Sequence, residues 1–429
     1  MNSKLAGTIA VGLACALLQA ACSTERQVVP TTFTDSAGVT IVSNDYLSPV
    51  WAPEARWTLA YQPDLQVGNI PGAPGHQLFH VSNSRRLANG GIVVANAGFG
   101  DVRVYDDMGG YLWTAGLGVN AADSAQPLLV FEPGPDELLV YQSDRSLARF
   151  HDTDPRPTRT TLEDPGEGLE EPQPIGVFRD GTMLFRARFP WDDTKTGIGR
   201  RRAWLLHYAQ DGKLIGAIAD VDDDAVLFAE HGVYVFAPTA AAAAGDSTVW
   251  YGDGEHYELK ELARDGRLLR IIRLNRPPSP VLWVDSTLYR RAVTQKVQGT
   301  ERDSSMAVTL DSSVFPDSFP VFDKILVDDL GDLWVRNYQW VDLGTGKSWT
   351  VFDPQGRFLG EVTTPTILTI HQIGDNFVLG RMQDPVGREA VYTFDLLKPG
   401  TTPPPGVAHP APADSGVPPA DSAGQPPPG

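Results

Sequence analysis

The chain has 429 residues, and 35 Lys and Arg against 53 Asp and Glu give it a formal net charge of −18. Apolar residues make up 42% and charged residues 21%, which is enough for a large core and excludes a mostly disordered chain. The acidic balance argues against nucleic acid as a partner, because duplex binding needs clustered cations. Only Cys15 and Cys22 are cysteines, so the rest of the chain has no disulfide, Cys-ligated zinc or thiol nucleophile.

Residues 1–22 are predicted to be a secretory signal. Lys4 precedes the apolar run Leu5 to Leu18, whose 14 residues are too few to span a bilayer, which takes about 20. The following Gln19-Ala20-Ala21-Cys22 resembles the bacterial lipobox, although Gln19 stands where that motif usually has an aliphatic residue. The resemblance implies diacylation of Cys22. The alternative is ordinary cleavage, which would leave a soluble periplasmic protein.

Two segments have the composition of linkers. Residues 23–36 are polar and are predicted to be a tether. Residues 398–429 form a predicted disordered tail, since 11 of the 35 prolines lie in 399–429 and such composition favours extended polyproline conformations. A spacer is the simpler interpretation of this tail, and a PxxP ligand is the alternative. The globular domain is predicted to span 37–397.

A repeat runs through this domain: a turn with Gly or Asp, followed by a strand of β-branched and aromatic residues. The turns of its copies lie at positions 91, 136, 181, 232, 331 and 375. A period of about 45 residues with four strands per unit is typical of a β-propeller blade. The sequence therefore predicts an all-β fold, a six-bladed β-propeller.

The long interval between the fourth and fifth copies has a different pattern. Apolar residues recur at three-four spacing from Leu288 to Val297, which predicts one inserted helix, capped by Asp285 or Ser286, between blades four and five. The sixth copy lacks a fourth strand. Either residues 38–42 or residues 56–60 are expected to supply it and close the ring.

The segment Asp328–Val335 resembles a turn of the six-bladed β-propeller lipoproteins of bacterial envelopes, which are related to NHL-type and TolB-like propellers. Its Asp and Gly fit the turn, and Trp334 is expected to pack between blades. The resemblance covers roughly residues 37–397. It implies a fold and a lipid-anchored location in the cell envelope, at the outer membrane facing the periplasm, but no activity.

No sequence motif predicts a cofactor. Gly346-Lys347-Ser348 lacks the first glycine of a phosphate-binding loop, because that position is Val341. The acidic run from Asp220 approaches a calcium loop, but Ala225 replaces the glycine of the turn. The histidines His80 and His371 are expected where the inner strands of blades one and six begin, so they are candidates for a metal or acid–base pair in the channel. The alternative is that they are ordinary hydrogen-bonded strand residues.

The long insertions are expected on one face, since loops between strands two and three and loops between blades emerge on the same side. They are residues 187–203, 238–255, 275–320 and 337–347. Binding residues usually lie on such loops. The ligand-face candidates are Arg188, Trp191, Asp192, Arg200, Arg202, Tyr251, Asp253, Tyr338, Trp340 and Arg381. The alternative is that these loops only cover the channel.

Two functions compete. In the first, the protein is a membrane-anchored binding or scaffold module for a protein, peptide or glycan. Its basic residues Lys195 and Arg200 to Arg202 either form a solvated loop or meet an anionic ligand or lipid headgroup. In the second, it is a divalent-cation-dependent hydrolase or lyase of the propeller lactonase kind. That enzyme would need a cation such as calcium and several Asp, Glu, Asn or His side chains converging in the channel.

Overall fold

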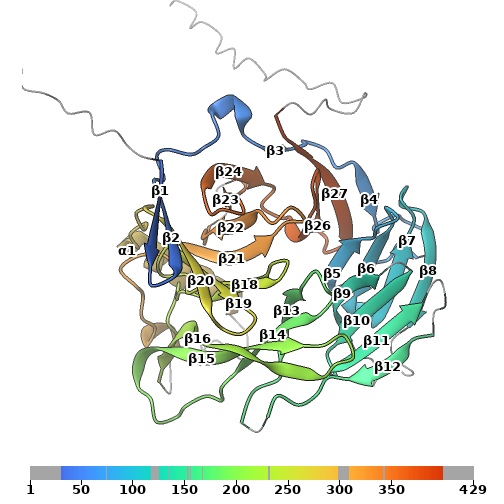
Figure 1. Ribbon diagram of the computed structural model, residues 1–429, viewed down its shortest axis with the longest axis horizontal. Coiled ribbons are helices and arrows are strands. Elements are labelled where there is room, and N and C mark those ends of the chain that lie inside the picture. Colours follow the sequence, from blue (N-terminus) through green and yellow to red (C-terminus); the bar gives the residue numbers. More distant parts are fainter. Residues whose placement is uncertain are drawn as a thin grey trace, which may run out of the picture.

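The strands form six sheets arranged around a central axis, as Figure 1 shows. The structure is a computed structural model that describes residues 30–399 apart from 74, 117–124, 135, 152–153, 155, 167, 230–231, 298–308 and 342–343. The first three sheets hold β5 (Val81–Arg86), β6 (Ile92–Asn96), β7 (Asp101–Tyr105) and β8 (Tyr111–Gly116); β9 (Pro127–Gly134), β10 (Glu137–Gln142), β11 (Ser146–His151) and β12 (Thr158–Thr161); and β13 (Gln173–Val177), β14 (Met183–Arg188), β15 (Gly197–Tyr208) and β16 (Leu214–Phe228).

The remaining sheets contain the inserted and terminal segments. They are built on β17 (Ala241–Ala244), β18 (Thr248–Gly252), β19 (Glu258–Ala263) and β20 (Leu268–Leu274); on β21 (Phe322–Val327), β22 (Leu333–Asn337), β23 (Lys347–Phe352) and β24 (Phe358–Thr364); and on β25 (Thr369–Ile373), β26 (Phe377–Gln383) and β27 (Glu389–Leu397). Consecutive strands of each sheet pair antiparallel. The fold is a β-propeller, as the sequence predicts.

The last sheet is completed by the N-terminal part of the chain. Strands β3 (Thr58–Leu59) and β4 (Leu65–Val67) both pair with β27, so the second of the two expected closing segments is the one used. The first segment has another role: β2 (Val39–Asn44) pairs in parallel with β20, and β1 (Thr31–Ser36) pairs with β2. Strand β1 thus lies within residues that the sequence assigned to the tether.

One copy of the predicted repeat is wrong. Residues 232–236 form no strand; Tyr234 makes an isolated bridge with Val314, and Phe236 has a left-handed φ of 56° and packs its ring against other aromatic rings. The second strand of that sheet is β18, and the turn before it contains Gly245 and Asp246. The expected insertion 238–255 therefore holds two strands of the sheet. The apolar residues of 232–236 face the inserted segment instead of a neighbouring strand.

The turn resembling envelope propellers has the expected chemistry. The Asp328 carboxylate accepts hydrogen bonds from the backbone N–H groups of Leu330 (3.0 Å) and Asp332 (2.8 Å), and Gly331 has a φ of 87°. Trp334 is fully buried, and its indole Nε1 donates to Asp328 at 3.1 Å. It packs in a cluster that joins the last two sheets, which confirms its predicted place between them.

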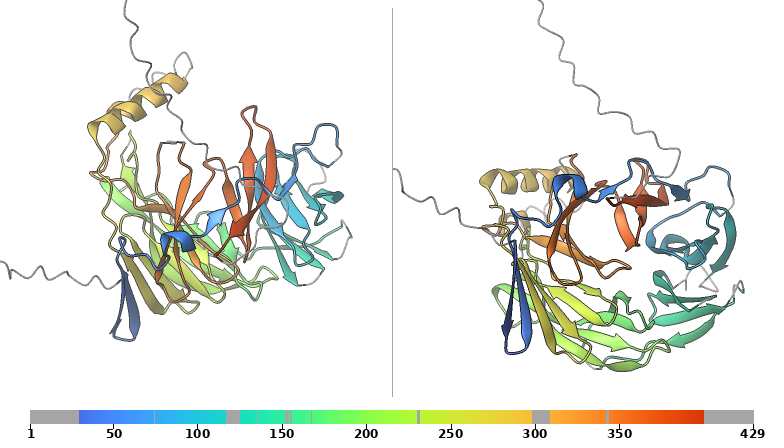
Figure 2. Two further views of the ribbon diagram at one scale, coloured as in Figure 1. Left: turned by 90° about the horizontal axis from the view of Figure 1, so that it is seen from above. Right: turned by 45° about the horizontal axis from the view of Figure 1, so that its top comes forward.

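The inserted helix α1 (Trp283–Val297) begins earlier than expected, and Asp285 lies inside its first turn. The Asp285 carboxylate accepts from the Leu282 backbone N–H at 2.8 Å, which satisfies one of the donors left open at a helix start. In the left view of Figure 2, α1 and the hairpin between β26 and β27 project to the same side of the ring. We call this side the loop face.

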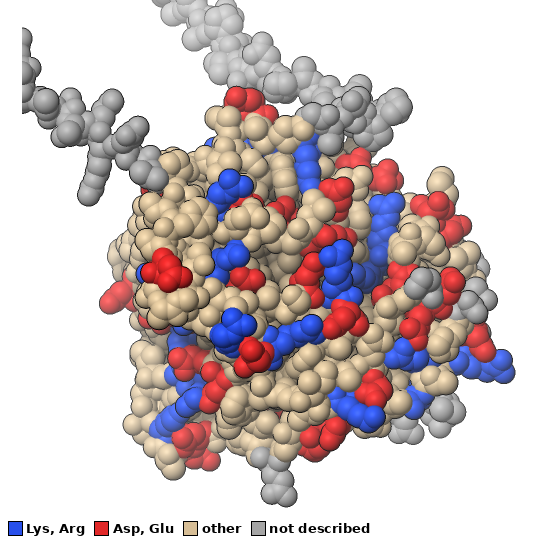
Figure 3. All heavy atoms as spheres, in the orientation of Figure 1, with Lys and Arg blue, Asp and Glu red and all other residues tan. Residues whose placement is uncertain are grey.

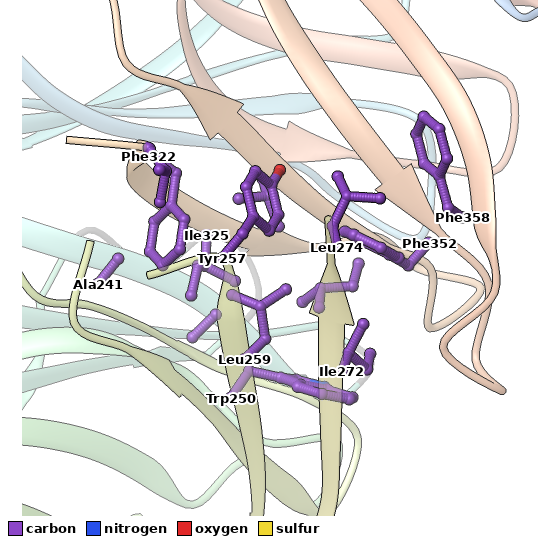
Figure 4. Close-up of a cluster of buried hydrophobic side chains, with 14 of the residues drawn as sticks. Ala241, Trp250, Tyr257, Leu259, Ile272, Leu274, Phe322, Ile325, Phe352 and Phe358 are labelled. Carbon is purple, nitrogen blue, oxygen red and sulfur yellow. The ribbon is translucent and has the colours of Figure 1, made fainter. Parts of the chain in front are cut away.

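The core lies between neighbouring sheets and consists of large apolar side chains. Figure 4 shows such a cluster, in which Leu259 and Ile272 of one sheet pack against Phe322 and Phe352 of the next sheet. These four side chains are fully buried. Truncating one such aromatic residue typically costs about 3–5 kcal/mol, so each sheet is held chiefly by its neighbours.

Candidate functional site

A cavity of about 380 Å³ opens on the loop face between α1 and the connection from β22 to β23. Its aromatic wall consists of Phe319, Tyr338 and Trp340, with the rings of Phe319 and Tyr338 stacked at 6.0 Å and 25°. Leu288 of α1 also lines the cavity. We call this cavity the aromatic pocket.

Aromatic contacts below the pocket hold its walls together. The Phe236 ring lies 5.0 Å from Trp340, 5.0 Å from Phe319 and 5.5 Å from Tyr289 of α1. Phe236 thus links the helix to the connection that carries Trp340. Such ring pairs add about 0.5–1.5 kcal/mol each beyond burial, so the pocket is organised before any ligand arrives.

Polar groups occupy one end of the pocket. Arg276 forms an ion pair with Glu361 at 3.2 Å, and its guanidinium lies 5.0 Å from the centre of the Tyr46 ring. Asn337 donates to the same Glu361 at 2.9 Å. Burial raises the pKa of the Tyr338 hydroxyl to about 12, so this side chain stays a neutral hydrogen-bonding group at physiological pH. The pocket is apolar with a few polar groups at one end, which is typical of a small-ligand site.

The predicted residues on the third and fourth sheets form a separate ionic cluster. Asp223 is fully buried and pairs with both Arg186 (2.8 Å) and Arg188, while Arg188 also reaches Asp224 at 2.6 Å. Arg200 donates to the backbone carbonyls of Asp223 (3.0 Å) and Asp253 (3.1 Å). Burying a carboxylate is costly unless it is paired, so these arginines are needed to hold Asp223 in place.

The other members of this group also have partners within the protein. Arg202 pairs with Asp220, and the buried Tyr251 donates its hydroxyl to the Asp222 carbonyl. Asp253 accepts from the backbone N–H groups of two following residues. The basic segment is therefore internally neutralised: Arg200 pairs with Glu255, Arg201 with Glu170, and Lys195 lies 3.9 Å from Asp192.

Trp191 has the greatest exposure of the aromatic candidates. It is 44% exposed and packs against Phe228 at 4.8 Å, with the Arg201 guanidinium 5.9 Å from its ring centre. A second cavity of about 380 Å³ lies over this ring. Asp192, beside it, accepts from the backbone and hydroxyl of Thr194, and these bonds lower the pKa of its carboxyl group.

The two channel histidines lie in different surroundings. His80 is exposed, has a φ of 50°, and its ring meets the edge of Phe79. His371 lies on the inner strand β25, and its Nδ1 is 2.7 Å from the Ser84 hydroxyl of β5. Burial, with the nearby Lys324 and Arg381, lowers the pKa of His371 to about 3. The residue is only partly exposed, and the protein around it keeps the imidazole neutral.

Lys324 is a channel residue that the sequence did not indicate. It comes from β21 and donates to the Ile370 carbonyl at 3.1 Å. Burial, and then Arg336, lowers the pKa of its ammonium group to about 8. Arg381, predicted for the ligand face, instead pairs with Glu389 at 2.7 Å. Glu389 also accepts from the Val81 backbone N–H, so this pair joins the last sheet to the first.

Within the residues that the structure describes, no group of three or more His, Cys, Asp and Glu side chains could hold a metal ion. In the same part of the chain, no helix is long and apolar enough to cross a membrane. Cys22 lies outside the described residues.

Tyr338 and Trp340 are the predicted residues that meet in the aromatic pocket. Sequence reasoning missed Phe236, Arg276 and Phe319, which complete it. Phe319-Pro320 follows the helix by more than twenty positions, and only the placement of the insertion brings it to Tyr338. The local signal that could have indicated this pocket is Pro277-Pro278 before the helix, since both prolines line the cavity.

No protein-family model matches the chain, and no curated protein matches it. Among solved structures, a DUF4221-family protein from Bacteroides vulgatus is 11% identical with a TM-score of 0.46, covering 80% of this chain and 99% of its own. Virginiamycin B lyase from Staphylococcus aureus is 10% identical with a TM-score of 0.39, covering 80% and 100%. BamB from Moraxella catarrhalis is 12% identical with a TM-score of 0.33, covering 85% and 96%. Identities this low indicate nothing about the activity of this chain.

Proposed function

We propose that the protein is a six-bladed β-propeller lipoprotein of the bacterial envelope, held at the outer membrane through Cys22, that binds a peptide or glycan in the aromatic pocket. The observation that carries the proposal is the wall of Phe319, Tyr338 and Trp340, built before ligand arrives and open to solvent on the loop face. Such a wall fits flat apolar surfaces, namely a proline ring or the apolar face of a sugar.

The pocket is favoured over the ionic cluster for a physical reason. The arginines near Asp223 already bind carboxylates, so an anionic ligand would have to displace internal ion pairs. A ligand at the aromatic wall would displace no ion pair from the rings, since these rings contact one another and still line an open cavity. Ligand binding there would remove apolar surface from water without breaking an ion pair.

The test is a titration of the full chain with two probe families, oligoproline peptides and peptidoglycan-derived oligosaccharides, followed by calorimetry. We expect one family to bind and Trp340→Ala to weaken that binding at least about tenfold, the loss of roughly 1.4 kcal/mol of apolar burial. Trp191→Ala is the matched control, because this exposed tryptophan lies over a different cavity. Binding that is equally strong in Trp340→Ala would place the ligand elsewhere.

The cation-dependent hydrolase or lyase is tested separately. Its requirement is a resident divalent cation, so metal analysis of the purified full chain addresses it directly. A stoichiometric metal, removed by a chelator together with a turnover activity, would favour the enzyme over the binding module.

A further inference from the structure

We propose that the start of helix α1 is a second membrane contact: Leu282, Trp283 and Val284 insert into the headgroup region of the bilayer that holds Cys22. This inference rests on the proposed lipid anchor and adds to it the orientation of the propeller. The bilayer would cover an apolar surface that the folded chain leaves exposed.

The three side chains form a continuous exposed apolar patch, which we call the α1 patch. Leu282 is 54% exposed, Trp283 is 79% exposed and Val284 is 40% exposed. The helix start is capped by the Asp285 carboxylate, which binds the Leu282 backbone N–H, and the three apolar side chains take no part in this cap. Tryptophan beside aliphatic residues at a helix start is suited to the membrane interface, where an amphipathic ring is half solvated.

Hydrogen bonds locate Pro30, the first described residue, beside the segment that leads to this patch. The Pro30 carbonyl accepts from Asp45 N–H at 2.9 Å, and the neighbouring Asn44 carbonyl accepts from Asn275 N–H at 3.2 Å. The Asn275 side chain also accepts from Tyr46 N–H and donates to Asp45. The entry of the chain into the fold and the exit toward α1 are therefore fastened to the same pair of residues.

The lengths of the two segments allow the lipid and the α1 patch to reach one surface. Eight residue steps separate Cys22 from Pro30, which span at most about 29 Å, and seven steps separate Asn275 from Leu282, at most about 25 Å. In Figure 1 and in both views of Figure 2, α1 and the β1–β2 hairpin lie at the same edge of the ring; the left view of Figure 2 shows that α1 projects to the loop face and the hairpin toward the opposite face. A bilayer against that edge, running parallel to the ring axis, would meet both.

The N-terminal segment at this edge has further exposed apolar residues. Phe33 on β1 is 53% exposed and Leu47 after β2 is 84% exposed. The protein has a net charge of −18, so attraction to anionic headgroups cannot drive the contact. We therefore expect the apolar side chains to supply the binding energy and the contact to be insensitive to salt.

The experiment uses the full-length lipidated chain in vesicles of phosphatidylethanolamine and phosphatidylglycerol, with an environment-sensitive dye on Trp283→Cys. The folded part contains no other cysteine, so the label is specific. The matched control is Met108→Cys, which replaces an 81% exposed apolar residue in the turn between β7 and β8, at the opposite edge of the ring in Figure 1. We expect a blue shift and quenching by brominated lipid at position 283 and neither at position 108.

A second variant separates docking from mere proximity. Leu282→Asp, combined with the label at position 283, should abolish the quenching while the chain still floats with the vesicles. Flotation with equal, unquenched emission at both labelled positions would overturn the α1 contact and leave the anchor intact. A chain that does not float, and that fractionates like Cys22→Ala, would overturn the anchor and with it this inference.

Discussion

At the scale of single residues, the turn between β21 and β22 places two carboxyl groups where they share one proton at mildly acidic pH. Asp328 and Asp332 are 3% and 7% exposed. Burial and the adjacent Asp328 raise the pKa of Asp332 to about 7, and burial also raises the pKa of Asp328. The pair therefore retains a proton at mildly acidic pH, which the unfolded chain would already have released.

The pH dependence of stability follows from this proton. A carboxyl group with a raised pKa in the folded state stabilises fully below its unfolded value of 3.8, and the contribution is lost as pH rises to about 7. The loss is at most about 4 kcal/mol. We expect Asp332→Asn to remove most of this decline, measured by urea unfolding at pH 5 and pH 8. Asp265→Asn, in an exposed turn, is the control; an unchanged decline in Asp332→Asn would contradict the assignment.

Some of the residues predicted for the ligand face line the pocket, and others do not. Tyr338 and Trp340 were predicted because a long connection between two strands of a propeller faces its loop side. Arg188 and Arg200 were predicted from the same reasoning and became internal ion-pair partners. Sequence does not show which charges find a partner, because Asp223 is separated from Arg188 by 35 positions and meets it only through strand register.

At the scale of elements, strand β2 fastens two sheets together through one side chain. Asn44 is 4% exposed; its amide donates to the Gly356 carbonyl at 2.9 Å and its carbonyl oxygen accepts from Phe358 N–H at 2.9 Å. Both bonds cross from the sheet of β20 to the sheet of β24. The isolated alternation of residues 38–42 predicted a strand but did not determine which edge it would cover.

We expect Asn44→Asp to reduce the free energy of unfolding by about 1–3 kcal/mol, because the carboxylate loses the donor and faces the Gly356 carbonyl. Chemical denaturation measures the change. Asn89→Asp is a matched control, since the Asn89 side chain only accepts a bond, from Gly91 N–H, and an aspartate preserves it. Equal effects of the two substitutions would show that the donor of Asn44 contributes nothing.

At the scale of the whole molecule, the repeat correctly predicted a ring of sheets. One of its copies, residues 232–236, forms no strand because these residues pack against the inserted segment. Residues 232–236 have strand composition, but Phe236 is needed under the pocket and the strand role passes to Thr248–Gly252. Composition alone cannot distinguish an apolar run that pairs in a sheet from one that packs on an insertion. On the face shown in Figure 3, cations and carboxylates are interspersed despite the net charge of −18.

Closure of the ring depends on Glu389 as well as on strand pairing. Because this buried carboxylate binds both Arg381 and the Val81 N–H, Glu389→Ala should cost about 3–5 kcal/mol by leaving Arg381 unpaired. Glu389→Gln keeps an acceptor for Val81 and should cost less. Hydrogen exchange should accelerate first in β5 and β27 for Glu389→Ala; acceleration spread evenly over all six sheets would argue against a role in closure.

The separate attachment of β1 and β2 has a mechanical consequence. A pull on the N-terminal tether loads β1, then β2, then β20, and reaches the fourth sheet without passing through β3 or β4, which complete the sixth. The β1–β2 hairpin would therefore detach first and spare the strand pairs that close the ring. Under the proposed lipid anchor, tension between the membrane and the domain would peel this hairpin before it opened the ring.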